Sequence, residues 1–285
     1  MRVIIDLQMM QSIAFKYKLK GKKIGFVPTM GALHEGHLSL IRAARRENDL
    51  VVVSIFVNPA QFGPKEDLRR YPRPIKKDLE LCKKEGADFI FYPNPGQIYP
   101  QGYKTYVAVE QLGQVLCGKS RPAHFRGVTT IVSKLFNIVL PDKAYFGQKD
   151  AQQTVVIKRM SQDLNFMTKI KVLPIVREID GLALSSRNSY LTSEGRKAAL
   201  VLSQALKLAK ELVSKGIKDS EKIISAMRKL IIKERLAKID YIEIVDSTDL
   251  KCLKKVSGEC FIVLAVWIGK TRLIDNILIK SKIKG

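Results

Sequence analysis

The chain has 285 residues, 46% of them hydrophobic, which is enough for one large or two ordinary domains with a substantial core. We find no run of about 18 apolar residues and no secretory signal, and we therefore expect a cytoplasmic protein without a transmembrane helix. Four scattered cysteines without a Cys-x-x-Cys pair argue against a disulfide scaffold or a zinc site, and we expect the net charge of +23 to be mostly solvated surface.

The first part of the chain alternates predicted strands and helices. We expect strands at 3–5, 24–27 and 50–57, a helix at 6–20 and a second helix ending near Glu47. Pro28 should end the strand before it, because proline has no N–H to donate to a sheet. The unbroken apolar run at 50–57 is typical of a central parallel strand covered on both faces. These elements predict a βαβ unit, and ligands of such sheets bind beyond the carboxyl ends of the strands.

The stretch 26–42 carries the strongest functional pattern. Gly31 permits a tight turn, and His34 and His37 are three residues apart, which places both on one face of the first helical turn. A helix N-terminus binds anions such as phosphate, and imidazoles add hydrogen-bond donors. The chain has only three histidines, so we interpret this pair as part of a functional site rather than as ordinary polar surface residues. Their spacing differs from the i, i+4 pair of zinc metalloproteases.

Three more positions follow predicted strands. Asn58 and Gln61 come after the strand at 50–57, where their amides suit a hydroxy-acid substrate, although an ordinary Asx-type turn explains either residue equally well. Lys149 lies between a predicted strand at 143–146 and a helix. A cation opposes the helix dipole there, so a chemical role explains this lysine better than helix stability does.

The remaining elements change character near Val176. Before it we expect helices at 74–86, 128–139 and 151–165 and strands at 88–92, 105–109 and 169–175. After it a polar loop precedes predicted helices at 193–215 and 220–237 and strands at 241–246, 261–267 and 273–279. We therefore predict an α/β domain with a parallel sheet at 1–175 and a smaller α+β domain at 176–285.

Several sequence blocks, taken in this order, resemble one family. They are Pro-Thr-Met-Gly-Ala-Leu-His-Glu-Gly-His, Phe-Val-Asn-Pro-Ala-Gln-Phe, Asp-Leu-Arg-Arg-Tyr-Pro-Arg, His-Phe-Arg-Gly-Val, Phe-Gly-Gln-Lys-Asp-Ala-Gln-Gln and Asp-Gly-Leu-Ala-Leu-Ser-Ser-Arg-Asn. A His-x-Gly-His turn alone indicates only the wider nucleotidyltransferase superfamily. Together, over nearly the whole chain, the blocks resemble the pantothenate synthetases, ligases that join pantoate to β-alanine with ATP. The resemblance implies a Rossmann-like nucleotide-binding domain with helices on both faces, a C-terminal lid, Mg²⁺ with the ATP, and a cytoplasmic homodimer.

The resemblance also implies site residues. The ATP set is Met30, Gly31, Ala32, Leu33, His34, Glu35, Gly36, His37, Gly147, Gln148, Lys149, Asp150, Val176, Leu184, Ser185, Ser186 and Arg187. Gln61 and Gln153 match the pantoate-holding pair, Asn58 and Tyr71 fall in matching blocks nearby, and Asp78 is a candidate for the metal. The expected catalytic residues are His34, His37 and Lys149, with His37 matching the proton donor. Gln148 stands where many relatives carry Glu.

Two half-reactions are implied. The pantoate carboxylate attacks the α-phosphorus of ATP to give pantoyl adenylate and pyrophosphate, and the β-alanine amine then displaces AMP to give pantothenate.

One alternative is a nucleotidyltransferase that shares the His turn, but it does not explain Gln61 with Gln153. Another is an RNA-binding protein, suggested by the net charge, whose binding would weaken steeply with salt. We expect small-molecule substrates, with no nucleic acid and no membrane.

Overall fold

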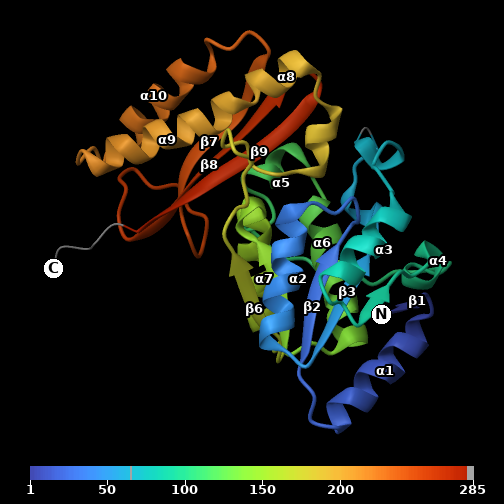
Figure 1. Cartoon of the computed structure of the whole chain (residues 1–285). Coiled ribbons are helices and arrows are strands. Elements are labelled where there is room, and N and C mark those ends of the chain that lie inside the picture. The colour runs from blue at the N-terminus through green and yellow to red at the C-terminus, as the bar shows by residue number, and fades with distance from the viewer. Residues whose placement is uncertain (65, 281–285) are drawn as a thin grey trace. The chain divides into compact units, whose positions relative to one another are not determined.

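The computed structural model describes residues 1–64 and 66–280, and the chain divides into two compact units (Figure 1). The N-terminal unit comprises residues 1–114, 118–147 and 156–174. The C-terminal unit comprises residues 115–117, 148–155 and, among the described residues, 175–280. Two short segments from the first part of the sequence therefore belong to the second unit.

The N-terminal unit contains a six-stranded parallel sheet, which confirms the predicted α/β class. Its strands are β1 (Arg2–Ile4), β2 (Ile24–Thr29), β3 (Leu50–Ile55), β4 (Phe89–Phe91), β5 (Lys143–Gly147) and β6 (Lys169–Leu173), in the order β1-β4-β3-β2-β5-β6. β2 has β3 on one side and β5 on the other, so the winding of the chain reverses at β2. Ligands of open α/β sheets bind beyond the carboxyl ends of strands at such a switch point.

Helices cover both faces of this sheet (Figure 1). The helices of more than one turn are α1 (Leu7–Leu19), α2 (Glu35–Glu47), α3 (Ile75–Lys84), α6 (His124–Val139) and α7 (Ala151–Asp163). Val52 of β3 belongs to a core cluster with residues of α1 and α6, whereas its neighbours Val51 and Val53 belong to a cluster with residues of α2 and α3. This alternation is what a strand buried on both faces requires.

β2 does not end at Val27 as predicted, but continues through Pro28 to Thr29. Its pairing with β3 runs along the whole strand, whereas pairing with β5 involves only Gly25 and Phe26. The N–H of Phe56 donates to the Thr29 carbonyl, so Thr29 faces β3 and Pro28 faces the opposite side. The missing N–H of Pro28 is tolerated because the pairing on that side has already ended.

Two other boundaries differ from prediction. The described residues at 105–109 form no strand, because side chains of α6 satisfy the Val107 backbone. Its N–H donates to Thr130 Oγ1 (3.0 Å) and its carbonyl accepts a bond from Thr129 Oγ1 (2.6 Å). α6 begins at His124 rather than at Val128, directly after Ala123, whose φ of 68° is left-handed. The predicted start at Val128 is therefore one helical turn too late.

The C-terminal unit packs two helices against an antiparallel sheet. Its elements are α8 (Ser193–Ala198), α9 (Leu200–Ser214), α10 (Ser220–Ile231), β7 (Ala237–Asp246), β8 (Glu259–Ile268) and β9 (Thr271–Lys280), with strand order β7-β8-β9. Alternate residues of β8, such as Ile262 and Leu264, share a buried cluster with α9 and α10. The predicted helix at 193–215 divides at Ala199. The second helix stops at Ile231, because Ala237 already pairs with β8.

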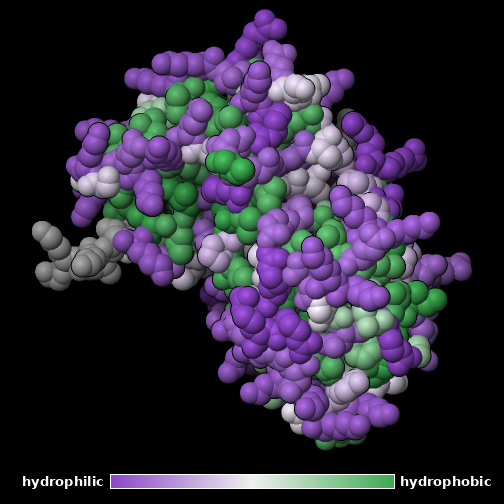
Figure 2. All heavy atoms as spheres, viewed as in Figure 1, coloured by the Kyte–Doolittle hydropathy of each residue, from purple (hydrophilic) through white to green (hydrophobic). Residues whose placement is uncertain are grey.

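Hydrophilic residues cover much of the face in Figure 2, as expected if the large positive charge is carried by solvated side chains. In the part of the chain that the structure describes, we find no helix with the length and apolar character needed to cross a membrane.

Candidate active site

The turn between β2 and α2 carries both histidines of the expected site. Gly31 has a left-handed φ of 80°, and a Cβ at this position would lie only 2.9 Å from Asp78 Oδ2. Both the backbone conformation and the lack of space therefore require glycine. His34 is the N-cap of α2, and its Nδ1 accepts the N–H of Gly36 (3.2 Å). The N–H of His34 in turn donates to His37 Nδ1 (3.3 Å). This reciprocal arrangement is a capping box built from two imidazoles.

The capping box fixes the chemistry of the two rings. Their centroids are 4.2 Å apart and their planes are inclined by 43°. Because each Nδ1 accepts a backbone N–H, each ring in its neutral form carries its proton on Nε2. His34 and His37 therefore act as Nε2–H donors at the N-terminus of a 13-residue helix. The helix dipole and the two ring donors together favour an anion.

Other residues of the expected ATP segment support this turn. A Cβ at Gly36 would lie 2.9 Å from His34 Cε1, so glycine makes room for the imidazole. Ala32 has a left-handed φ of 51°, and Leu33 is buried. Glu35 forms an ion pair with Arg42 further along the same helix. This ion pair stabilises the start of α2, and a contact of Glu35 with ATP stays a prediction.

Asp78 of α3 holds the same turn. Its Oδ2 accepts the N–H of Ala32 and its Oδ1 the N–H of Leu33, both at 2.8 Å, and the residue is 1% exposed. Burial raises the pKa of this carboxyl, and the two amide hydrogen bonds counter that rise without cancelling it. The structure therefore gives Asp78 a positioning role that the sequence did not suggest. The assignment to a metal stays a prediction.

Asn58 and Gln61 meet after the end of β3. Asn58 Nδ2 donates to Gln61 Oε1 (3.0 Å) and to the Gly127 carbonyl (3.1 Å). Asn58 Oδ1 accepts the hydroxyl of Tyr99 (2.8 Å) and the N–H of Ala60 (3.3 Å). Both donors and both acceptor positions of this amide are used, and the residue is 1% exposed. Asn58 consequently orients Gln61, and its expected contact with substrate stays a prediction.

The orientation of Gln61 follows from this bond. Its Oε1 is taken by Asn58, and its Nε2 lies 3.1 Å from Met30 Sδ, next to the histidine turn. Its backbone carbonyl accepts bonds from α6 and the segment before it, including His124 Nδ1 at 2.8 Å. The Gln61 side chain is thus oriented with its donor group, Nε2, toward Met30.

The rest of this unit's site is apolar with a few charges. Tyr71 is buried and packs edge-on against Phe62, with ring centroids 6.0 Å apart. A cavity of about 130 Å³ opens beside Met30 and Gly31. Its other lining residues are Ile55, Phe56, Val57, Arg73, Ile75, Asp78, Tyr92, Pro93 and Pro95. A small ligand entering it would meet one guanidinium and one carboxylate among apolar walls.

Lys149 lies in the C-terminal unit, although it follows β5 in sequence. It belongs to a short 3-10 turn, η3 (Gln148–Asp150), that begins directly after Gly147 and leads into α7. Lys149 Nζ is 3.5 Å from Asp150 Oδ1, and its side chain is 20% exposed. Gln153 lies one turn further on, in the first turn of α7, and is partly buried.

The segment from Val176 to Arg187 begins as a hairpin. The N–H of Leu184 donates to the Val176 carbonyl (3.0 Å), and Arg177 and Ala183 form a bridge. Ser185 then caps a second 3-10 turn, η4 (Ser186–Tyr190), by accepting the N–H of Arg187 (3.3 Å). The two hydroxyls and the guanidinium of this segment thus project from a defined turn rather than from an irregular loop.

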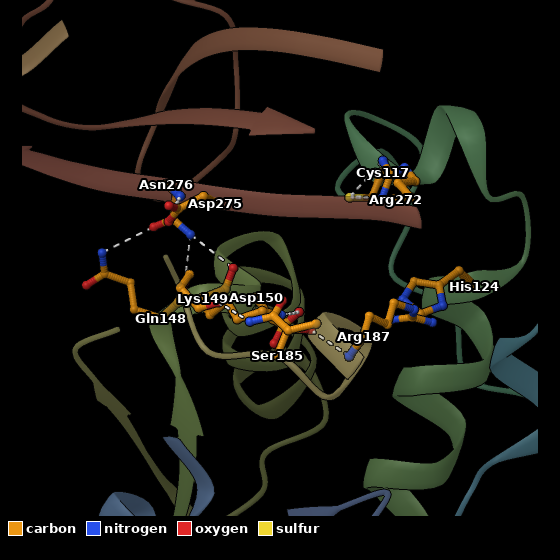
Figure 3. A network of polar contacts seen from close by, with 12 residues as sticks. Cys117, His124, Gln148, Lys149, Asp150, Ser185, Arg187, Arg272, Asp275 and Asn276 are labelled. Carbon is orange, nitrogen blue, oxygen red and sulfur yellow. Dashed lines mark hydrogen bonds and ion pairs between the residues drawn. The ribbon is translucent and has the colours of Figure 1, made fainter. Parts of the chain in front are cut away.

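Two residues of β9 anchor these segments (Figure 3). Asp275 binds Arg177 through both carboxylate oxygens, at 2.7 and 2.8 Å. Asn276 Nδ2 donates to the carbonyls of Gln148 (2.9 Å) and Lys149 (3.0 Å). Neither residue was predicted from the sequence, and Tyr99 was also missed. The signal for the first two was present, because a polar pair interrupts the apolar strand Leu273–Ile279.

The predicted residues therefore form two sets. The N-terminal unit brings together the turn from Met30 to His37 with Asn58 and Gln61. The C-terminal unit joins the Lys149 turn and the hairpin from Val176 to Leu184 to adjacent residues of β9. The meeting of the two sets around one nucleotide is part of the function proposed below.

Residues 2–278 match the family model for pantoate-beta-alanine ligase. The chain belongs to this family. It is 56% identical to a pantothenate synthetase of Caldicellulosiruptor bescii, over 99% of this chain and 100% of the relative. As a member of this family the chain is an enzyme of the ligase class, as the sequence blocks predicted.

Solved structures of pantoate-beta-alanine ligases agree with the fold. The pantothenate synthetase of Thermus thermophilus superposes with a TM-score of 0.92 at 41% identity, covering 97% of this chain and 99% of that chain. A ligase of Francisella tularensis, solved in complex with beta-gamma ATP and beta-alanine, has a TM-score of 0.80 at 38% identity and covers 98% and 97%. The Rossmann-like sheet and the small antiparallel sheet are thus shared with these ligases.

Proposed function

We propose that the chain makes pantothenate from pantoate and β-alanine in two steps that use ATP. In the first, a pantoate carboxylate oxygen bonds to the α-phosphorus while the bond to the α,β-bridging oxygen breaks and pyrophosphate leaves. In the second, the β-alanine nitrogen bonds to the acyl carbon and loses a proton, and AMP leaves. Such chemistry asks a protein mainly for positioning and for stabilisation of negative charge.

The observation that carries this proposal is the capping box of His34 and His37. Both rings are fixed as Nε2–H donors at the start of α2, beyond the carboxyl end of β2. Donors placed in advance where phosphate charge develops lower the barrier without reorganising. We assign the phosphates of ATP to this helix N-terminus, with His37 as the proton donor and the turn from Met30 as the surrounding backbone.

Pantoate is assigned to the amide of Gln61, together with Gln153. Since Oε1 of Gln61 is bound by Asn58, the group offered to the substrate is its Nε2. An N–H donor suits the carboxylate or a hydroxyl oxygen of a hydroxy acid. The cavity beside Met30 and the buried ring of Tyr71 are on the same unit and would enclose the apolar part of the substrates.

The C-terminal unit contributes cations to the proposed site. Lys149 supplies an ammonium, Ser185 and Ser186 supply hydroxyls, and Arg187 can bind a phosphate through two N–H groups at once. We propose that this unit acts as a lid that brings these groups onto the phosphates. Closure would also exclude water, which would otherwise hydrolyse the acyl adenylate.

Mg²⁺ is proposed to enter with ATP. In the described part of the chain, no group of three or more His, Cys, Asp or Glu side chains could hold a metal ion. Enzymes that bind nucleotides often hold Mg²⁺ with one or two carboxylates together with phosphates and water. The two amide bonds to Asp78 leave acceptor positions on its carboxylate, so this residue fits such a donor set. When bound, the ion would neutralise phosphate charge.

Positional isotope exchange tests the adenylate. With ATP labelled in the α,β-bridging oxygen, pantoate present and β-alanine absent, the label should scramble into non-bridging positions of the β-phosphate. Omitting pantoate should stop the exchange. Active protein that shows no pantoate-dependent exchange would reject the adenylate, and a product that retains the nucleotide in place of free AMP would favour the nucleotidyltransferase alternative.

Two variants test the site itself. His37→Ala and Lys149→Ala should each lower turnover far more than they lower the thermal midpoint of unfolding. A variant that unfolds while its folded fraction keeps normal turnover would instead mark a structural residue.

The assembly and partners are proposals from the family resemblance. We propose a cytoplasmic homodimer, so light scattering should give twice the mass of the 32.1 kDa chain. Tight RNA binding that falls steeply with salt would contradict the assignment to small-molecule substrates alone.

A further inference from the structure

Asn276 and its neighbour Asp275 are the two polar residues within the run Leu273–Ile279 of β9, and the Asn276 amide makes three hydrogen bonds. It is 2% exposed, and its Nδ2 donates both hydrogens to consecutive main-chain carbonyls, those of Gln148 (2.9 Å) and Lys149 (3.0 Å). Its Oδ1 accepts a bond from Gln148 Nε2 (3.2 Å). Only the amide orientation with Nδ2 toward the two carbonyls satisfies this set.

These bonds explain why the Lys149 turn belongs to the C-terminal unit. β5 ends at Gly147 within the N-terminal unit, yet residues 148–155 are part of the other unit. Asn276 ties this turn to β9 through three hydrogen bonds, and the neighbouring Asp275 holds Arg177 of the hairpin. Adjacent residues of one strand thus fix the two segments that carry Lys149 and Ser185–Arg187 (Figure 3).

We propose that Asn276 is a positioning residue for Lys149. By binding the carbonyls of Gln148 and Lys149, which flank the Lys149 Cα, it sets the direction of the lysine side chain and holds this ammonium at a fixed distance from Arg187. The cations of the proposed lid then act as one rigid block rather than as two independently mobile loops. This inference rests on the proposed function, in which Lys149 binds the phosphates of ATP.

The test replaces the amide with a side chain of nearly the same shape. Asn276→Leu removes both donors without adding charge. Thr271→Val is the matched control, because it also removes a buried polar group of β9, at the first residue of the strand, five residues before Asn276. We expect Asn276→Leu to lower kcat of adenylate formation by about 10- to 100-fold, a loss typical of misplaced catalytic groups. The KM for β-alanine should not change, and Thr271→Val should keep normal kinetics.

A double-mutant cycle separates positioning from general damage. In the Lys149→Ala background, Asn276→Leu should cause little further loss, because the group that it positions is already absent. The same factor of loss in both backgrounds, or a kcat within twofold of the unmodified chain, would overturn the proposal. Asn276→Ala provides a second variant if Asn276→Leu does not fold, and a failure of both to fold would make Asn276 a folding residue only.

The outcomes also distinguish this inference from the function beneath it. If the unmodified chain forms no pantothenate, or Lys149→Ala turns over normally, the proposed function or the role of Lys149 fails. If the unmodified chain forms pantothenate and Lys149→Ala loses turnover, but Asn276→Leu keeps a normal kcat, only the positioning role is rejected.

Discussion

The N–H of His34 donates to Nδ1 of His37, and the N–H of Gly36 donates to Nδ1 of His34, so two histidines complete one capping box. A helix cap and a proposed catalytic pair are thus the same groups. Stability and chemistry at this turn are therefore linked, and a substitution must be chosen to separate them.

His37→Asn separates the two roles. The asparagine Oδ1 can still accept the His34 N–H, as Nδ1 does, but the Nε2–H donor is lost. We expect kcat to fall by about 10²- to 10³-fold, the range for removing one donor that stabilises developing charge, with little change in thermal midpoint. His37→Ala should show the same kinetic loss and an additional loss of cap stability of about 1 kcal/mol. Steady-state kinetics with thermal melts of both variants check this, and equal melting losses in both would contradict the cap assignment.

Tyr99→Phe tests the chain of bonds that orients Gln61. It removes the hydroxyl that donates to Asn58 Oδ1 at 2.8 Å, and Asn58 in turn donates to Gln61 Oε1. We expect a rise of roughly tenfold in the KM for pantoate, corresponding to about 1.4 kcal/mol, with a smaller change in kcat. Tyr103→Phe is the control, since its ring packs on Tyr99 but Asn58 receives its bond from Tyr99. An unchanged KM for pantoate in Tyr99→Phe would mean that Gln61 is held without this relay.

The ion pair of Glu66 with Arg121 makes the stability of the fold depend on pH. Burial pushes the pKa of Glu66 up, but the hydrogen bonds and charge of Arg121, at 2.5 Å, outweigh it and lower the pKa below its ordinary value. A carboxyl with a depressed folded-state pKa stabilises the fold fully above its unfolded pKa of about 4.3 and loses that contribution as pH falls through the folded value. Glu66→Gln should therefore cost most at neutral pH and least in acid. Denaturant titrations of both proteins from neutral to acid pH check the sign, and a gap that widens in acid would contradict it.

Gly127→Ala tests how α6 supports the substrate amides. A Cβ at Gly127 would lie 2.2 Å from the Ala60 carbonyl oxygen, and this backbone cannot give way as a flexible side chain would. We expect a loss of stability of about 1–3 kcal/mol and a raised KM for pantoate, because the displaced segment carries Gln61. Gly216→Ala is unsuitable as a control, because Gly216 has a left-handed φ. A Cβ at Gly147 would meet no atom within 4 Å, but Gly147 belongs to the predicted ATP site. Gly96→Ala, with only a loose 3.5 Å contact to Asn94, is the better match.

Local patterns predicted most of the N-terminal sheet and the histidine turn. The apolar run of β3 and the cluster of Gly31, His34 and His37 are readable because neighbouring residues along the chain create them. The continuation of β2 through Pro28 was not, since it depends on where pairing with β5 stops. The absence of a strand at 105–109, among the described residues, depends likewise on the hydroxyls of Thr129 and Thr130.

The candidate site shows the same division. The sequence identified Asn58 by its place after a strand. Its hydrogen bonds to Tyr99, Gln61 and Gly127 depend on the tertiary fold, and they make Asn58 a residue that orients Gln61. Asp78 and Asn276 likewise bind backbone groups far away in sequence. Residues expected to contact ligands sit in recognisable turns, whereas residues that hold those turns can come from any element that passes behind them.

The path of the chain limits how this protein can be divided. Residues 148–155 lie in the first part of the sequence but are built into the C-terminal unit. A gene cut at the codon for Ile175 would leave residues 148–155 in the N-terminal fragment, without the strand that binds them. The C-terminal fragment would lack the backbone carbonyls to which Asn276 donates. Domain exchange between related ligases should accordingly transplant the 115–117 and 148–155 segments together with the C-terminal sequence.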